Sequence, residues 1–303
     1  MIKKPSEIHS AFFILKIMKI SEAVKYGKQI LGNDYSLDVE VLLAFAAKIS
    51  REQIYTQDDA DLLDDELFKQ LIDERRKGKP VAYLIGKKEF YGIDFFVDER
   101  CLVPRPETEM IVDEVIEYFN EKNIEEGGFK EGLIFDVGTG SGAIGFSLAK
   151  MLPDCRVFCF DIGDGVAAVA NKNLDELQLE NASVVVSDLL AAADDDIIPE
   201  VIVANLPYIG LEKYNFVDDD VKAYEPHLAL FGGFDGLDLY RKLFGQILER
   251  DYPGRGLKLI MGEFGFAQLE EIVNLIEGAF GSSSYKIIPD LSGIDRFFKI
   301  LIK

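Results

Sequence analysis

The chain has 303 residues, of which 48% are hydrophobic, and this is enough to bury a full core in one large or two unequal domains. Acidic residues outnumber basic ones by 54 to 33, which gives a formal net charge of -21. Because nucleic-acid binding depends on Lys and Arg at phosphates, this charge argues against stable nucleic-acid binding and favours a protein partner.

Membrane segments, disulfides and metal sites have little support in the sequence. No apolar run approaches the roughly 20 residues of a membrane span, and Lys16 and Lys19 interrupt the only stretch that resembles a signal peptide. The odd number of cysteines argues for a reducing, cytoplasmic location. Cys155 and Cys159, read as one strand, lie about 13 Å apart, too far for one zinc ion.

Residues 19–78 show helical periodicity and no strand signal. Apolar residues repeat on one face of a first segment and on one face of a second, with a polar turn between them: Leu37, Val41, Leu42 and Phe45, then Leu63, Leu67, Leu71 and Ile72. This pattern predicts a small helical bundle.

A link between domains is predicted next. Gly78 and Pro80 end the bundle, and residues 89–97 alternate with aromatics as a β-hairpin does. Pro106 suits the first position of a helix with acidic residues in its first turn. The apolar face of that helix is expected to be Ile111, Val112, Val115, Ile116 and Phe119.

From residue 133 onwards strands and helices alternate. Strands are predicted at 133–137, 156–160, 183–186, 201–204, 257–261, 284–288 and 296–302, and helices from Ser141 and at 165–178, 237–250 and 266–279. This alternation predicts a mainly parallel sheet with helices on both faces and a ligand site at the carboxyl ends of the strands. The last two strands have no helix between them and should pair antiparallel. The acidic run at 194–196 is interpreted as a solvated loop.

The stretch L-I-F-D-V-G-T-G-S-G-A-I-G, residues 133–145, reads as a strand, a glycine-rich turn and a helix N-terminus. Gly138, Gly140 and Gly142 allow left-handed backbone angles and close approach to a ligand, so a cofactor cradle is predicted. Gly140, Gly142 and Gly145 also spell the dinucleotide fingerprint, so this stretch alone leaves a nicotinamide and a nucleoside site open.

A second stretch, V-I-V-A-N-L-P-Y at 201–208, brings Asn205 to the edge of the sheet. Pro207 forces Leu206 into an extended conformation. The Asn205 side-chain oxygen and the Leu206 carbonyl are then two fixed acceptors, which suit the two hydrogens of a planar NH2 group. Asn and Pro also make ordinary turns, so the tetrad alone does not settle a function.

Taken together, these motifs resemble a known family. The cradle and the N-L-P-Y tetrad look like those of S-adenosylmethionine-dependent methyltransferases that act on amide or exocyclic amine nitrogens. Four further motifs are similar to the HemK/PrmC branch, which methylates the glutamine of peptide chain release factors: P-V-A-Y-L-I-G-K-K-E-F-Y-G (80–92), L-V-P-R-P-E-T-E (102–109), Y-E-P-H-L-A-L-F-G-G-F-D-G-L-D-L-Y (224–240) and D-L-S-G-I-D-R (290–296). The resemblance runs from about Met18 to the C-terminus, so the first 17 residues are interpreted as an extension or a misplaced start.

The resemblance implies an α/β fold of the class I methyltransferase type: a Rossmann-like, seven-stranded, mostly parallel sheet with an antiparallel last strand, plus a small N-terminal helical bundle. It also implies three regions, namely a substrate-recognition domain at 18–85, a β-hairpin linker at 86–104 and a catalytic domain at 105–303. The protein is expected to be a monomer that binds release factors as substrate.

The implied cofactor is S-adenosyl-L-methionine, and its expected binding residues are Asp136, Gly138, Thr139, Gly140, Ser141, Gly142, Asp161, Asp188, Leu189 and Asn205. The residues expected to bind the substrate and carry the catalysis are Asn205, Leu206, Pro207 and Tyr208. No metal is expected. Arg105 and Glu107 lie in the P-R-P-E-T-E segment, which the family places beside the active site, but a good helix start explains them as well.

One position departs from the family pattern. The glutamine methyltransferases usually have N-P-P-Y, whereas Leu206 replaces the first proline here, as in adenine dimethyltransferases of ribosomal RNA. Adenine methylation of nucleic acid therefore stays open. So does glutamine methylation of a ribosomal protein, because a sister branch shares nearly all these motifs, and so does a non-catalytic binding module built on the same fold. A nicotinamide oxidoreductase would leave the tetrad unexplained.

Overall fold

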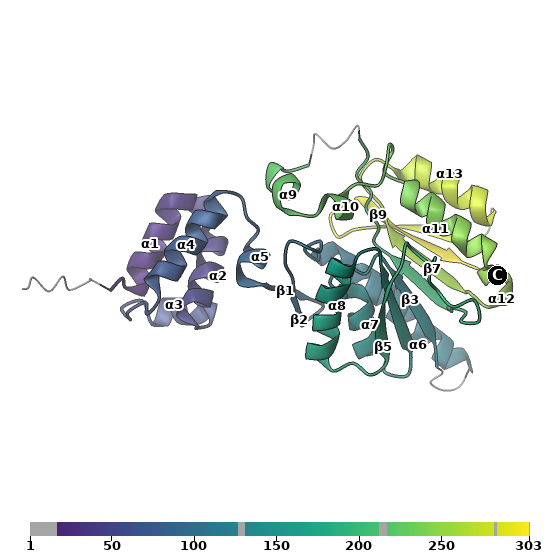
Figure 1. The fold of residues 1–303 in the computed structure, drawn as a ribbon, viewed down its shortest axis with the longest axis horizontal. Coiled ribbons are helices and arrows are strands. Elements are labelled where there is room, and N and C mark those ends of the chain that lie inside the picture. Colours follow the sequence, from purple (N-terminus) through teal and green to yellow (C-terminus); the bar gives the residue numbers. More distant parts are fainter. Residues whose placement is uncertain (1–16, 127–130, 212–216, 282–283, 303) are drawn as a thin grey trace, which may run out of the picture. The chain divides into compact units, whose positions relative to one another are not determined.

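The computed structural model describes residues 17–126, 131–211, 217–281 and 284–302, and the chain divides into two compact units, 1–85 and 86–303 (Figure 1). The extension expected before Met18 lies, apart from Ile17, outside the described residues. No helix in the described part of the chain is long and apolar enough to cross a membrane.

The first unit is a helical bundle, as predicted. Its elements are α1 (Ile20–Leu31), the short 3-10 helix η1 (Asn33–Tyr35), α2 (Ser36–Ala47), α3 (Arg51–Thr56), α4 (Asp65–Arg76) and α5 (Val81–Ile85). Helices α1, α2 and α4 pack against one another. A Cβ at Gly27 would lie 2.6 Å from Val39, so glycine allows α1 and α2 to approach closely. The Asp64 side chain accepts from the backbone N–H of Leu67 and caps α4.

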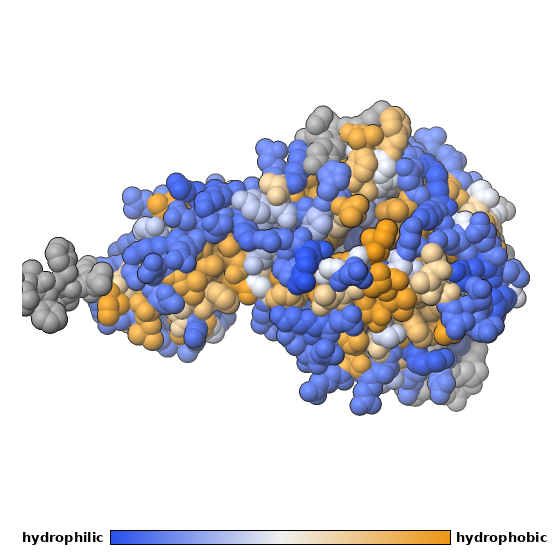
Figure 2. Space-filling model, in the orientation of Figure 1, coloured by the Kyte–Doolittle hydropathy of each residue, from blue (hydrophilic) through white to orange (hydrophobic). Residues whose placement is uncertain are grey.

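The predicted apolar faces of this bundle are partly wrong. Leu37 and Phe45 are 55% and 44% exposed, whereas Leu42 is buried as predicted. Other core residues of α2 are Val39, Leu43 and Ala46, which the predicted face did not include. Because α2 is apolar nearly all round, its periodicity fits more than one face. Leu63 is 91% exposed because it precedes the cap of α4 and lies outside the helix. Apolar residues gather over the lower part of this unit in Figure 2.

The second unit begins with the predicted hairpin, formed by β1 (Lys87–Phe90) and β2 (Ile93–Phe96). Tyr91 and Gly92, with φ of 53° and 69°, make a two-residue turn of the type that matches strand twist. The chain then enters η2 (Pro106–Thr108) and α6 (Glu109–Glu126). Four residues of the predicted apolar face are buried, namely Ile111, Val112, Val115 and Phe119, and the fifth, Ile116, is half-buried.

A seven-stranded sheet follows, in the order β5-β4-β3-β6-β7-β9-β8. Its strands are β3 (Leu133–Val137), β4 (Arg156–Asp161), β5 (Ala182–Val186), β6 (Val201–Ala204), β7 (Leu259–Glu263), β8 (Tyr285–Pro289) and β9 (Asp295–Leu301). The helices are α7 (Ala143–Met151), α8 (Asp164–Leu177), α9 (Asp219–Tyr224), α10 (His227–Leu230), α11 (Asp238–Glu249), α12 (Tyr252–Arg255) and α13 (Leu269–Phe280). Only β9 runs antiparallel to its neighbours, β7 and β8. The predicted Rossmann-like methyltransferase architecture is confirmed.

Two hydrophobic layers sandwich this sheet. On β3, Ile134 packs into the layer with α6, α7 and α8, whereas Phe135 packs into the layer with α11, α12 and α13 (Figure 1). This alternation follows from the two-residue period of a strand. Because the parallel strands are buried on both faces, polar side chains are left to the strand ends, where the candidate site lies.

Candidate active site

A cavity of about 450 Å³ opens at the carboxyl ends of β3, β4 and β6. Most of the predicted site residues line it: Gly138, Thr139, Gly140, Ser141, Asp161, Asp188, Leu189, Asn205, Leu206 and Pro207. Asp136, Gly142 and Tyr208 lie beside this wall rather than on it. The two stretches singled out in the sequence therefore meet at one cavity.

The glycine-rich turn has the backbone geometry that its sequence predicts. Gly138, Gly140 and Gly142 take φ of 76°, 60° and 88°, all in the left-handed region. The N–H groups of Gly138 and Thr139 both donate to the Phe160 carbonyl at 2.9 and 3.0 Å, which fixes the turn against the end of β4. A Cβ at Gly140 would meet no described atom within 4 Å, so this part of the turn borders open space.

Asp136 supports the turn from below. It is fully buried, and its Oδ2 accepts from the Thr139 hydroxyl at 2.6 Å and from the Gly145 N–H at 2.9 Å. Its Oδ1 has no hydrogen-bond partner among the described residues. Burial raises the pKa of this carboxyl to about 6, against the two hydrogen bonds, which lower it. Asp136 thus shapes the cradle without forming its surface.

Two further carboxylates stand on the cavity wall. Asp161, at the end of β4, accepts from the Gly140 N–H at 2.8 Å and from the Ile162 N–H at 2.8 Å. Burial raises the pKa of Asp161 although these bonds oppose it. Asp188, after β5, is more exposed and pairs with Lys242 on α11. Gln246 of α11 bonds both the Asp188 carbonyl and the Leu190 N–H, which holds the loop after β5.

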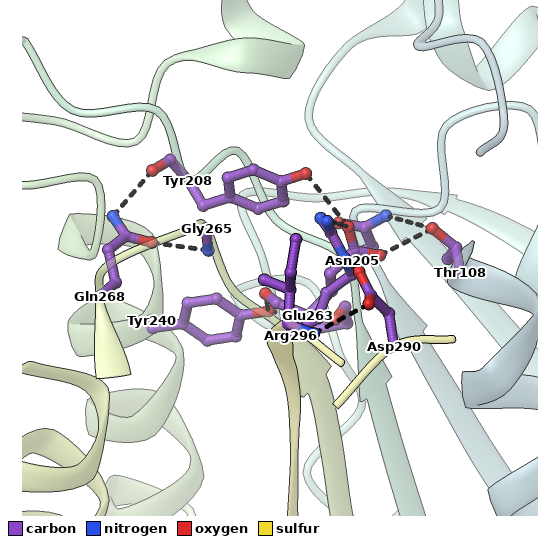
Figure 3. A network of polar contacts seen from close by, with 11 residues as sticks. Thr108, Asn205, Tyr208, Tyr240, Glu263, Gly265, Gln268, Asp290 and Arg296 are labelled. Atoms are coloured by element: carbon purple, nitrogen blue, oxygen red, sulfur yellow. Dashed lines mark hydrogen bonds and ion pairs between the residues drawn. The ribbon is translucent and has the colours of Figure 1, made fainter. Parts of the chain in front are cut away.

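Asn205 is half-buried directly after β6, and its Nδ2 donates to the Thr108 hydroxyl at 3.2 Å (Figure 3). Leu206 is only 2% exposed, and its side chain packs toward the glycine turn, where a Cβ at Gly138 would lie 2.9 Å from it. The Tyr208 hydroxyl donates to Glu263 Oε1 at 3.1 Å. Gln268 donates to the Tyr208 carbonyl at 2.9 Å, so both ends of this residue are fixed.

Residues of the P-R-P-E-T-E, Y-E-P and D-L-S-G-I-D-R motifs also contribute to the polar network in and beside the cavity. Arg105 of the P-R-P-E-T-E segment forms a 2.5 Å ion pair with Glu225 of the Y-E-P segment, whose carboxylate is buried. Asp290 accepts from Arg296 at 2.8 Å and from two backbone N–H groups of its own loop. Arg105 lines the cavity, whereas Glu107 is exposed.

Sequence reasoning missed three polar residues beside the site. Thr108 and Glu263 are buried and bonded to each other at 2.7 Å, although 155 positions separate them. Asn173 of α8 bonds both backbone groups of Phe96 and the Ser141 carbonyl, which joins the hairpin to the glycine turn. Glu263 had one usable signal in the sequence, because it is a carboxylate that follows the predicted strand 257–261 by two residues; the structure extends that strand to Glu263 itself.

Comparison with known proteins gives two matching families. Residues 22–86 match the PrmC N-terminal domain, and residues 116–222 match the Methyltransferase small domain. The chain is 34% identical to the release factor glutamine methyltransferase of Koribacter versatilis over 262 residues, which cover 86% of this chain and 89% of that protein. It is also 34% identical to the protein of the same name from Clostridium acetobutylicum over 291 residues, or 92% and 97% of the two chains.

Among solved structures, the hMettl16 catalytic domain in complex with MAT2A 3′UTR hairpin 6 is similar with a TM-score of 0.54. The two share 14% sequence identity, and the match covers 70% of this chain and 77% of the other. At this identity the likeness concerns the fold alone.

Proposed function

Because the chain belongs to the family of release factor glutamine methyltransferases, we propose that it transfers a methyl group from S-adenosyl-L-methionine to the glutamine side chain in the Gly-Gly-Gln loop of peptide chain release factors. The observation that carries this proposal is the position of Asn205. Its side chain lies on the wall of the cavity that the glycine turn also lines, and its amide is held by Thr108.

The residues around the cavity fit the proposed cofactor. Gly140 leaves open space where a side chain would stand, and Ser141 carries a buried hydroxyl with no hydrogen-bond partner in the described part of the chain. Asp161 keeps lone pairs that can accept from ribose hydroxyls, and Asp188 and Leu189, also on the cavity wall, are the residues we assign to the adenine. When bound, S-adenosyl-L-methionine supplies an electrophilic methyl group on a sulfonium.

The contribution of the protein is orientation and electrostatics. An amide nitrogen is a poor nucleophile because its lone pair is delocalised. Asn205 Oδ1 and the Leu206 carbonyl accept the two amide hydrogens of the glutamine, which aims the lone pair and stabilises positive charge growing on nitrogen. Pro207 keeps the backbone before it extended, and the ring of Tyr208 packs against the amide plane. Proton loss to solvent follows methyl transfer.

We assign recognition of the folded release factor to residues 18–85. Their exposed apolar side chains, among them Leu37 and Phe45 on one side of α2, offer a surface that the core of the bundle does not need. Phe45→Ser should raise KM for the release factor severalfold and leave kcat and cofactor binding unchanged. Leu248→Ser, at an equally exposed apolar side chain of α11 in the second unit, is the matched control. Equal effects of the two variants would contradict this assignment.

The central experiment is a methylation assay with purified release factor, a ribosomal protein and RNA, read by mass spectrometry. Glutamine of the release factor should gain one methyl group, and a factor with that glutamine replaced by alanine should gain none. Asn205→Ala should lower turnover by about 10²-fold, the scale of losing one preorganised polar group. Asn171→Ala, on the exposed side of α8, is the control. Methylation of adenine in RNA with an unmodified release factor would refute the proposed substrate.

A further inference from the structure

Glu263 is a buried carboxylate that the proposed mechanism does not use. It ends β7, is 1% exposed, and does not line the cavity. Its Oε2 accepts from the Thr108 hydroxyl at 2.7 Å, and its Oε1 accepts from the Tyr208 hydroxyl at 3.1 Å. Arg296 of β9 approaches Oε1 at 3.9 Å and is itself held by Asp290. A charge buried at this depth is costly unless such partners are present.

The bond to Glu263 decides what Thr108 can do for Asn205. A hydroxyl has one proton to donate, and an ionised carboxylate can only accept. Because Thr108 gives its proton to Glu263, it can offer Asn205 only a lone pair. Asn205 must therefore turn its NH2 group toward Thr108, as the 3.2 Å contact shows (Figure 3). The amide oxygen is then left at the opposite end, and it accepts no hydrogen bond from the residues that the structure describes.

We propose that Thr108 and Glu263 are positioning residues that fix the Asn205 amide in the one orientation that presents its oxygen to the substrate. The proposal rests on the proposed function and goes beyond it, because it assigns roles to two residues that the proposed mechanism does not use: Thr108, which lines the cavity, and Glu263, which does not. An amide rotated by 180° would direct N–H donors at the NH2 group of the glutamine. Two sets of donors repel each other, so that orientation cannot support transfer.

The surroundings of Glu263 indicate how pH acts on this chain of hydrogen bonds. Thr108 and Tyr208 bond its carboxylate, Arg296 and Glu107 act on it through charge, and Tyr240 of α11 donates to its backbone carbonyl. Burial raises the pKa of Glu263, whereas the Thr108 and Tyr208 bonds and Arg296 lower it. Protonated Glu263 can donate to Thr108, which frees the hydroxyl proton of Thr108 to meet the Asn205 oxygen. Acidification should therefore release the amide.

Three variants test the inference in the full-length chain. Thr108→Val keeps the shape of the side chain and removes the hydroxyl, Thr108→Ser keeps the hydroxyl, and Glu263→Gln keeps the shape and removes the charge. In Thr108→Val, kcat should fall about tenfold, the size expected from losing one orienting hydrogen bond. KM for the release factor and calorimetric binding of S-adenosylhomocysteine should stay within threefold of wild type. Thr108→Ser should recover most of kcat.

A second readout does not depend on turnover. In spectra of 15N-labelled protein, the side-chain NH2 signals of Asn205 are identified by their loss in Asn205→Ala. Thr108→Val should shift them toward the positions of a free amide, Thr108→Ser should not, and Glu263→Gln should remove their dependence on pH in the acid range. Unchanged signals in Thr108→Val, or a kcat equally low in Thr108→Ser and Thr108→Val, would overturn the inference. A wild-type chain that leaves release factor unmethylated would refute the proposed function instead, and the NMR result would still stand by itself.

Discussion

The raised pKa of the buried Asp136 carboxyl predicts how the free energy of unfolding changes with pH, and the size of that change can be calculated. Asp136 has a pKa of about 6 in the folded protein, and the ordinary value of an aspartate is 3.8. Between these values the unfolded chain releases the proton while the folded chain keeps it, so the free energy of unfolding falls as pH rises from about 4 to about 6. A difference of about two pKa units corresponds to roughly 3 kcal/mol. The ionised form is disfavoured because burial removes water and Oδ1 lacks a partner among the described residues.

The test compares wild type with Asp136→Asn, which is neutral at every pH and has nearly the same shape. Urea unfolding followed by circular dichroism at pH 4, 5, 6 and 7, without ligand, gives the free energy of unfolding of each protein. The variant should gain about 3 kcal/mol relative to wild type between pH 4 and pH 7. Asp154→Asn removes an exposed carboxylate at the other end of the same strand–helix unit and is the control. A gap between Asp136→Asn and wild type that is constant with pH would refute the reasoning.

Two further predictions concern the cradle and the loop after β5. Gly140→Ala should keep the fold, at a cost of about 1 kcal/mol for the left-handed conformation, and should weaken binding of S-adenosylhomocysteine. Gly142→Ala should lower the melting temperature strongly, because its Cβ would lie 2.1 Å from the Phe146 ring. Equal melting temperatures of the two variants would contradict this geometry. Lys242→Ala should change the free energy of unfolding by less than about 0.5 kcal/mol, since both side chains of its ion pair with Asp188 are exposed to solvent. Asp188→Ala should weaken the binding of S-adenosylhomocysteine measured by calorimetry. Unchanged binding in Asp188→Ala would remove this residue from the proposed site.

The sheet could be predicted because its signals are local. Strand 133–137 and strand 201–204 have the bounds expected from their apolar runs, since a parallel strand buried on both faces is apolar along most of its length. Asp136, near the carboxyl end of strand 133–137, is the exception. Helix starts were less accurate: α7 begins at Ala143 rather than Ser141, because the turn extends through Gly142 in the left-handed region. The direction of β9 followed from the missing helix before it.

The faces of α2 could not be predicted, because a helix with apolar residues nearly all round does not say which of them a neighbour will cover. The contact between Thr108 and Glu263 could not be predicted for a different reason. Each residue has an ordinary local explanation, one in a helix start and the other at a strand end, and only the fold brings them together. The glycine turn and Asn205 could be found from the sequence because each stands in a recognisable motif. The buried residues that hold Asn205, Thr108 and Glu263, could be found only from the structure.

At Leu206 the sequence and the structure lead to different conclusions about the substrate. A proline after Asn205 would restrict the Asn205 backbone, and the sequence alone suggests that leucine loses this restraint. The buried Leu206 side chain packs toward Gly138, so it joins the tetrad to the glycine turn, and its carbonyl accepts no backbone hydrogen bond from the described residues. The side chain of Asn205 is held by Thr108 and, through it, by Glu263. Because both acceptors can be held without the proline, Leu206 does not by itself favour adenine over glutamine. Under the proposed function, substrate choice depends on surfaces outside the tetrad, and there the net charge of -21 disfavours RNA phosphates and so favours a protein loop.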